Sequence, residues 1–176
     1  MTDAGTGGFR RGIRLGVDVG TVRVGVARSD PDGVLAVPVS TVARPPRGRR
    51  TDLEEIAALV AEYEPLEVVV GLPVTLDGIE GPAAEAVRGY VTDLAAVLLG
   101  RGNPVPLRLV DERMSTAEAS RGLREAGRTS RTSRAVVDQA AAVIIVQHAL
   151  DAERSTGHPP GTLVDPGLAD PQEDPA

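Results

Sequence analysis

The stretch Ile13–Ala27, which reads IRLGVDVGTVRVGVA, decides the fold expected for this chain. Apolar side chains occupy every second position from Ile13 to Val19, which is typical of a β-strand with one packed face. A turn is expected at Gly20-Thr21, after which the alternation resumes with three valines. Two such runs joined by a short turn predict a β-hairpin at the start of the sheet.

The order of the remaining elements predicts one mixed sheet covered by helices. A third strand is expected at about 34–42, and two apolar runs without alternation, at 66–72 and 105–110, are typical of buried parallel strands. Helices are expected from 51, where Thr51-x-x-Glu54 forms a capping box, over about 82–100, from a second cap at Ser115-x-x-Glu118 to about 127, and over about 134–153. The sequence therefore predicts an α/β fold with a mixed five-stranded sheet, three antiparallel strands and then two parallel ones, flanked by helices.

Composition limits the class of protein. The 176 residues fit one domain, which we expect at 13–154, between a flexible leader (1–12) and a disordered, acidic, proline-rich tail (155–176). The absence of cysteine excludes disulfides, a thiolate nucleophile and sulfur-bound zinc. The longest unbroken apolar run, Ala140–Val146, is far shorter than the ~20 residues of a membrane span, and the first residues lack the apolar core of a secretory signal. We therefore expect a soluble cytoplasmic protein without a membrane partner.

The distribution of charge is more informative than the net charge of −6. All 19 basic residues are arginines, and many of them gather in two segments, 44–50 and 121–134. Such arginines either lie solvated on exposed helix faces or form local basic patches that bind phosphates. Aromatic residues make up only 2% of the chain, so contacts with a nucleic acid are expected through its sugar-phosphate backbone rather than through base stacking.

Asp18 is the first candidate site residue. The residues around it on its own strand face and on the opposite strand are all small: Gly16, Gly20, Gly25 and Ala27. A carboxylate in such a cleared patch leaves room for a bulky ligand to approach. The alternative is a strand aspartate that faces solvent and has no task, although aspartate is disfavoured in strands.

Asp111 and Glu112 end a buried strand at its carboxyl side, where open α/β sheets bind ligands. Either acid could instead favour the start of the next helix through the helix dipole. Adjacent strand residues point in opposite directions, so only one of the two is expected to join Asp18. Glu112 has the longer side chain and is the expected partner, and Asp111 stays the alternative.

Asp138 lies in the helix expected at 134–153, which is apolar on nearly all sides. Such a helix should lie deep against the sheet, where a charge is unfavourable unless it is paired or bound to a metal. The alternative to a metal ligand is a partner of the helix dipole or of an arginine, for which Arg134 is one helical turn away.

Three carboxylate positions on separate elements suggest metal-dependent hydrolysis of phosphodiesters. In this chemistry carboxylates hold Mg²⁺ or Mn²⁺, which activate the attacking water and stabilise the leaving oxygen. Hard divalent ions prefer oxygen ligands, and this chain offers no cysteine and two histidines only. Nearby arginines would bind the flanking phosphates.

Four segments of the chain resemble the YqgF/RuvX family in order and spacing. They are LGVDVGTVRVG at 15–25, VVVGLPVTLDG at 68–78, VDERMSTA at 110–117 and VDQAAAVIIV at 137–146, so the resemblance extends over about 13–150. Members of this family are described as Holliday junction resolvases and as nucleases that mature the 5′ end of pre-16S ribosomal RNA. The resemblance implies an RNase H-like fold, catalytic and metal-binding roles for Asp18, Glu112 and Asp138, and Mg²⁺ or Mn²⁺ as the cofactor.

The sequence departs from the family pattern at three places. Family members commonly carry a lysine directly after the Gly-Thr turn, where this chain has Val22, and basic residues before the last-helix aspartate, where it has Val136. The strand at 68–72 also lacks the acid that junction resolvases of the broader superfamily place at its end, so Glu112 would have to take that role. The residues that we expect to bind the substrate are Thr21, Arg23, Arg113 and Arg134.

The sequence thus favours a metal-dependent endonuclease of structured nucleic acid, either a ribosomal RNA precursor or branched DNA, as a monomer or a homodimer. One alternative is a nucleic-acid-binding module with a degenerate site. The other is a nucleotide-binding domain of the actin or sugar-kinase type, because Asp18-x-Gly20-Thr21 resembles the first phosphate turn of those proteins. Such proteins need two domains, and 176 residues are too few for both.

Overall fold

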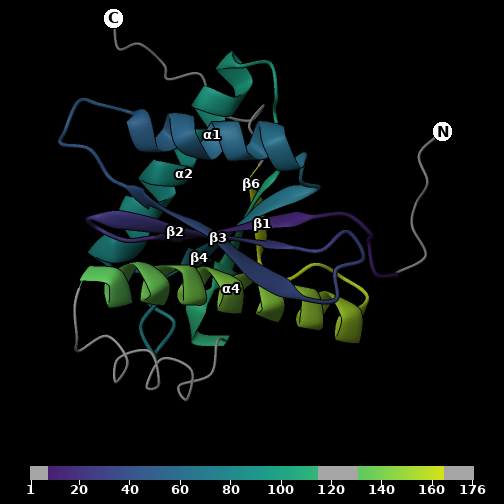
Figure 1. The fold of residues 1–176 in the computed structure, drawn as a ribbon. Helices are drawn as coiled ribbons and strands as arrows, with labels where there is room; N and C mark the ends of the chain where they lie inside the picture. Colours follow the sequence, from purple (N-terminus) through teal and green to yellow (C-terminus); the bar gives the residue numbers. More distant parts are fainter. Residues whose placement is uncertain (1–7, 115–130, 165–176) are drawn as a thin grey trace, which may run out of the picture.

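The computed structural model describes residues 8–114 and 131–164, which contain one six-stranded sheet (Figure 1). Across the sheet the strands follow the order β3-β2-β1-β4-β5-β6. Their bounds are Arg14–Val19 (β1), Arg23–Ser29 (β2), Ala36–Ala43 (β3), Glu67–Leu72 (β4), Leu107–Asp111 (β5) and Thr162–Val164 (β6). The described helices are Thr51–Tyr63 (α1), Pro82–Gly100 (α2) and Arg131–Thr156 (α4), with a 3-10 turn, η1, at Glu112–Met114.

The expected hairpin lies at the centre of the fold. β1 pairs antiparallel with β2, and the register places Asp18 opposite Gly25. The amide of Gly20 donates to the carbonyl of Arg23 over 2.9 Å and closes the turn. β3 pairs antiparallel with β2, so the prediction of three antiparallel strands is confirmed.

Two parallel strands, with helices on both faces, continue the sheet. β4 pairs parallel with β1, and β5 pairs parallel with β4. Every residue of β4 is buried, as expected for a strand that is covered on both faces. Figure 1 shows α1 and α2 above the sheet and α4 below it. The larger core includes Ile56 of α1 and Leu94 of α2, and α4 packs on the opposite face through Ala142 and Val146.

A sixth strand lies where the sequence predicted a disordered tail. β6 pairs antiparallel with β5 and extends the sheet beyond the five strands expected. In the turn before it, Gly161 has a φ of +77°, and a Cβ there would lie 2.0 Å from the carbonyl oxygen of Leu109. Only glycine fits such a position. Gly161, one of the glycines that indicated disorder, therefore belongs to a turn. Ordered structure continues past residue 154.

Helix α1 begins without the capping box expected from Thr51-x-x-Glu54. Its N-cap is Arg50, whose side chain makes no capping hydrogen bond, and Thr51 is already helical. The amide of Glu54 donates to the carbonyl of Arg50, and its carboxylate accepts from Arg101. Both groups are therefore engaged elsewhere, and the reciprocal bonds of a capping box do not form. The second expected cap, at Ser115, lies outside the described residues.

The end of the expected leader is tied to the domain by ion pairs. Arg10 bridges Glu67 of β4 and Glu153 of α4, and both carboxylates are buried. Arg14 of β1 contacts Glu153 as well. From residue 8 onward this segment is therefore part of the folded domain rather than a flexible leader, because two buried carboxylates hold its arginine.

Helix α4 combines length with an apolar composition. Over Arg134–Thr156 it is long and apolar enough to cross a membrane by these two criteria. The core helix of a soluble protein has the same properties, and α4 lies along β1, β2 and β3. The composition of α4 is thus weak evidence for a membrane span, and one face of the helix packs on the sheet.

Candidate active site

Asp18 lies near the carboxyl end of β1, on the face of the sheet that α4 covers. Its antiparallel partner on β2 is Gly25. On the other side lies β4, in which Val70 pairs with Val17 of β1. Gly71, the next residue of β4, therefore lies beside Asp18, the next residue of β1. Asp18 is therefore flanked on both neighbouring strands by glycine, as the cleared patch in the sequence predicted for the β2 side.

The two glycines allow other elements to approach Asp18 closely. A Cβ at Gly25 would lie 2.0 Å from the backbone oxygen of Asp138, so α4 runs directly over this point of β2. A Cβ at Gly71 would lie 2.8 Å from Oε1 of Glu112. Glu112 thus extends its carboxylate over the carboxyl end of β4, where that strand has no acid of its own. The structure brings Asp18, Glu112 and Asp138 to one end of the central strands.

The charges of Glu112 and Asp138 act on Asp18. Burial, followed by the negative charges of Glu112 and Asp138, raises the pKa of Asp18 from 3.8 to about 7. Burial and the charge of Asp111 raise the pKa of Glu112 as well. Carboxylates whose ionisation is suppressed by burial and by like charges gather at functional sites.

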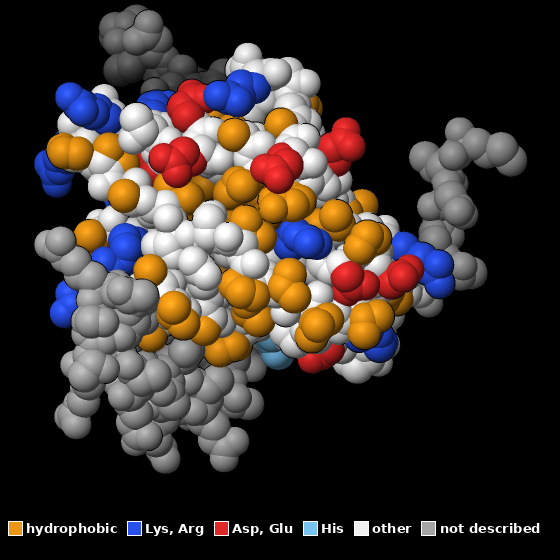
Figure 2. Space-filling view, in the orientation of Figure 1, with side chains coloured by type: hydrophobic (Ala, Val, Ile, Leu, Met, Phe, Trp, Pro, Cys, Tyr) orange, Lys and Arg blue, Asp and Glu red, His pale blue; other side chains and the backbone are white. Residues whose placement is uncertain are grey.

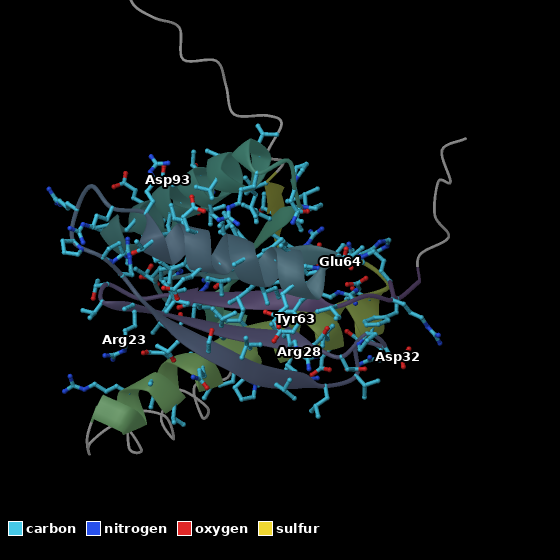
Figure 3. All side chains as sticks on the ribbon, turned by 45° about the horizontal axis from the view of Figure 1, so that its top comes forward. Arg23, Arg28, Asp32, Tyr63, Glu64 and Asp93 are labelled. Atoms are coloured by element: carbon cyan, nitrogen blue, oxygen red, sulfur yellow. The ribbon has the colours of Figure 1, made fainter. Side chains whose placement is uncertain are left out.

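Asp138 is held by an arginine of the hairpin. Nε of Arg23 donates to Oδ2 of Asp138 over 2.7 Å, and the two side chains are 30% and 25% exposed. The ion pair considered from the sequence is therefore present, but its partner is Arg23 and not Arg134, which is exposed. Figure 3 shows Arg23, the first residue of β2, beside the start of α4. Asp138 is half-buried rather than deeply buried, because it lies where α4 reaches this end of the central strands.

Asp111 makes a separate contact. Nε and Nη2 of Arg113 donate to its carboxylate, and this hydrogen bonding holds the pKa of Asp111 below its ordinary value. Nη1 of Arg113 also donates to the carbonyl of Leu76 over 3.1 Å, which fastens the loop after β4 to the end of β5. Of the two acids that the sequence left open, the structure brings Glu112 to Asp18.

The remaining predicted site residues lie at the rim of this carboxylate cluster. Thr21 is exposed in the hairpin turn, and Arg134 is exposed near the start of α4. Val22 and Val136, the two valines at which the sequence departs from the expected family pattern, are 64% and 59% exposed. The surface therefore presents uncharged side chains at these two points.

Carboxylate oxygens are suitable ligands for a divalent cation, but the structure does not arrange three of these carboxylates to coordinate one ion. Within residues 8–114 and 131–164, no group of three or more His, Asp or Glu side chains is arranged to hold a metal ion. Mg²⁺ is commonly bound by one or two carboxylates together with waters and substrate phosphates. Asp18 and Glu112 fit such an ion, whereas Oδ2 of Asp138 is bound by Arg23.

Two features of this region were not predicted from the sequence. The first is the Arg23–Asp138 pair, whose members are 115 residues apart. The second is a cavity formed by the arginine-rich segment 44–50 with Tyr90. The density of arginine in the segment 44–50 was a visible signal for the cavity, but nothing in the sequence around Tyr90 marked it as a lining residue.

Comparisons with known proteins identify a family. Residues 12–152 match the family model described as "RuvX: Holliday junction resolvase". A relative from Streptomyces coelicolor, named "Putative pre-16S rRNA nuclease", is 56% identical over 157 residues, which cover 89% of this chain and 90% of the relative. A relative of the same name from Thermobifida fusca is 52% identical over 164 residues, which cover 89% and 98% of the two chains.

A solved structure supports the fold. The chain is similar to T. thermophilus RuvC in complex with a Holliday junction substrate, with a TM-score of 0.52 and 15% sequence identity. The similarity covers 85% of this chain and 99% of the RuvC chain. It shows the fold alone, and it confirms the RNase H-like class that the motifs implied.

Proposed function

Because this chain belongs to the RuvX family of Holliday junction resolvases, we propose that Asp18, Glu112 and Asp138 form the catalytic centre of a metal-dependent endonuclease. The chain is a nuclease, a hydrolase that acts on phosphodiester bonds. The observation that supports the assignment of the centre is the position of Asp18 between two glycines, with the charges of Glu112 and Asp138 acting on it.

The proposed roles follow from the contacts of each side chain. Asp18 and Glu112 would hold Mg²⁺ or Mn²⁺, which supplies Lewis-acid stabilisation and an activated water when bound. With a pKa of about 7, Asp18 is only partly ionised at neutral pH, so it must release its proton before it serves as a ligand. Arg23 keeps Asp138 neutralised in the metal-free site and can turn to a substrate phosphate once a cation takes its place.

The substrate that we propose is structured nucleic acid recognised through its backbone. The names of the relatives favour a precursor of 16S ribosomal RNA, and branched DNA is the other substrate that the family description supports. Thr21, Arg23, Arg113 and Arg134 are the proposed substrate-binding residues at the rim. We also propose that the protein acts in the cytoplasm, as a monomer or as a homodimer.

Cleavage assays on both substrates test the proposal. A 5′-labelled ribosomal RNA precursor and a four-way DNA junction are incubated with the protein and Mg²⁺, Mn²⁺ or EDTA. Asp18→Asn and Glu112→Gln should lower the cleavage rate at least 100-fold, and Asp111→Asn should keep it within about tenfold, because only the first two acids hold the ion.

A matched control is Asp77→Asn, which removes an exposed carboxylate in the loop after β4 and should cleave like the parent chain. Equal cleavage by the parent and the folded Asp18→Asn variant would refute the catalytic assignment. Binding of both substrates without cleavage under any metal condition would instead show a nucleic-acid-binding module with a degenerate site.

A further inference from the structure

A cavity of about 660 Å³ lies at the start of α1, on the face of the sheet opposite to α4, and it reaches Thr21 of the hairpin turn that follows Asp18. Its volume is in the range of ligand pockets, which is about 300–1,000 Å³. Four arginines of the loop between β3 and α1 line it, together with residues of α1 and α2: Arg44, Arg47, Arg49 and Arg50, with Asp52, Tyr90 and Asp93. Figure 2 shows basic side chains around the end of α1 where this loop lies.

The charges of this arginine cavity favour an anion. Asp52 is buried, and its carboxylate lies 3.8 Å from Nε of Arg44. Asp93 lies 3.9 Å from Arg50. In the part of the chain that the structure describes, Arg47 and Arg49 form no ion pair with a carboxylate. Asp52 and Asp93 are therefore paired with Arg44 and Arg50, and the guanidinium groups of Arg47 and Arg49 can bind a ligand.

Tyr90 provides the second, independent sign of a ligand. Tyr90 is 6% exposed and lines the cavity. Its buried hydroxyl lies near the carboxylate of Asp52 but makes no well-formed hydrogen bond within the described residues. A buried polar group without a partner is unfavourable. The guanidinium of Arg44 stacks 5.0 Å from the centre of the Tyr90 ring, so one arginine is already fixed next to this hydroxyl.

The cavity and the carboxylate cluster share the hairpin turn. Thr21 lines the cavity, three residues after Asp18. Nη1 of Arg44 donates to the carbonyl of Gly20 over 2.9 Å, and the amide of Arg44 donates to the carbonyl of Val22. Figure 3 shows Arg23 of the cluster and Asp93 of the cavity on the same side of the molecule. A single nucleic-acid strand that crosses this turn can contact both.

We propose that the arginine cavity binds a phosphodiester group of the substrate strand, one that flanks the bond cut at the carboxylate cluster. Arg47 and Arg49 contribute charge, and the Tyr90 hydroxyl donates a hydrogen bond to a phosphate oxygen. This inference rests on the proposed nuclease function and adds a second anchoring point to it.

Binding measurements on two variants test the cavity. In the Asp18→Asn background, which blocks cleavage, the affinity for a fluorescent ribosomal RNA precursor fragment is measured by anisotropy between 50 and 300 mM salt. Arg47→Gln should weaken binding about tenfold and reduce the slope of log K against log salt by about 1. Tyr90→Phe should weaken binding several-fold without changing that slope, because it removes no charge.

The stability of Tyr90→Phe separates binding from folding. The variant removes a buried hydroxyl that lies near Asp52 without a well-formed hydrogen bond, so its unfolding midpoint should stay close to that of the background protein. A purely structural tyrosine would lower stability and affinity together. Arg11→Gln is the control for lost charge, because Arg11 is an exposed arginine whose ion pair, within the described residues, is with the exposed Asp32, and it should bind within twofold of the background.

The outcomes distinguish the cavity from the nuclease function. If Arg47→Gln and Tyr90→Phe bind the RNA as tightly as Arg11→Gln does, the inference is wrong. If AMP or inorganic phosphate binds and Tyr90→Phe weakens only that binding, the cavity holds a free phosphate compound and the inference is also wrong. If the parent chain never cleaves but both variants lose affinity, the anchoring point stands and the nuclease proposal fails.

Discussion

Replacing Asp18 by Asn should stabilise the metal-free protein above neutral pH. The folded protein raises the pKa of Asp18 from 3.8 to about 7, so between these values the unfolded chain releases a proton that the folded chain keeps. The free energy of unfolding of the parent therefore falls as pH rises from about 4 to about 7 and then levels off. Since one pKa unit is 1.36 kcal/mol, the loss through this one group is at most about 4 kcal/mol.

The assay is urea denaturation of both proteins in EDTA at pH values from 4.5 to 8.5. Other groups titrate in this range, so the informative quantity is the difference in unfolding free energy between the variant and the parent at each pH. This difference should increase toward high pH by about 2–4 kcal/mol, because asparagine bears no charge to be repelled by Glu112 and Asp138. Asp77→Asn, the exposed control, should show a difference that is independent of pH.

Divalent cations should reverse the effect. At pH 8, millimolar Mg²⁺ or Mn²⁺ should stabilise the parent through binding to the folded state, and Asp18→Asn should gain less. Parallel pH profiles of the parent and the variant would refute the reasoning, because they would show that Asp18 is not buried among carboxylates. A variant that is less stable than the parent at pH 8 would refute it as well.

Two further substitutions test the supports of the site. Gly25→Ala should lower the unfolding free energy by about 1–3 kcal/mol and reduce cleavage, since the new methyl group would lie 2.0 Å from the backbone oxygen of Asp138; unchanged thermal stability would mean that α4 does not touch β2 there. Glu153→Gln should cost about 3–5 kcal/mol in urea denaturation at pH 7, because it leaves Arg10 and Arg14 without their shared buried carboxylate. Burial opposes ionisation of Glu153, but the hydrogen bonds and charges of the two arginines hold its pKa below the ordinary value, so the loss should shrink as pH falls below about 4.5; a constant loss would contradict this.

The elements that sequence predicted well are those with a strong local period. The hairpin around Asp18 follows from strict alternation, and the continuous valines at 68–70 indicated a buried parallel strand, which β4 is. The strand β6 has neither signal, since its three residues are stabilised by pairing with β5 and by the glycine turn before it. Its order comes from contacts with a distant part of the chain, which composition does not report.

The candidate site shows the same division between local and distant information. Asp18 could be identified from the small residues around it, and Glu112 could be preferred over Asp111 by its reach. The roles of Gly71 and Arg23 became visible only with the packing of η1 and α4 onto the sheet, because Glu112 lies over Gly71 and Arg23 binds Asp138. The sequence identified the carboxylates, and the structure identified the residues that bring them together.

Buried acids are paired with arginines at one end of the sheet and lie near other acids at the opposite end. This contrast indicates which end binds a ligand. At the amino end Glu67 and Glu153 are fully buried, and each binds two arginines of the chain. At the carboxyl end Asp18 lies near two other acids instead, and its burial, followed by the charges of Glu112 and Asp138, raises its pKa. At the amino end both buried acids are paired with arginines, whereas at the carboxyl end Arg23 pairs with Asp138 and not with Asp18. The excess of acids at the carboxyl end therefore supports the cation site that we propose there.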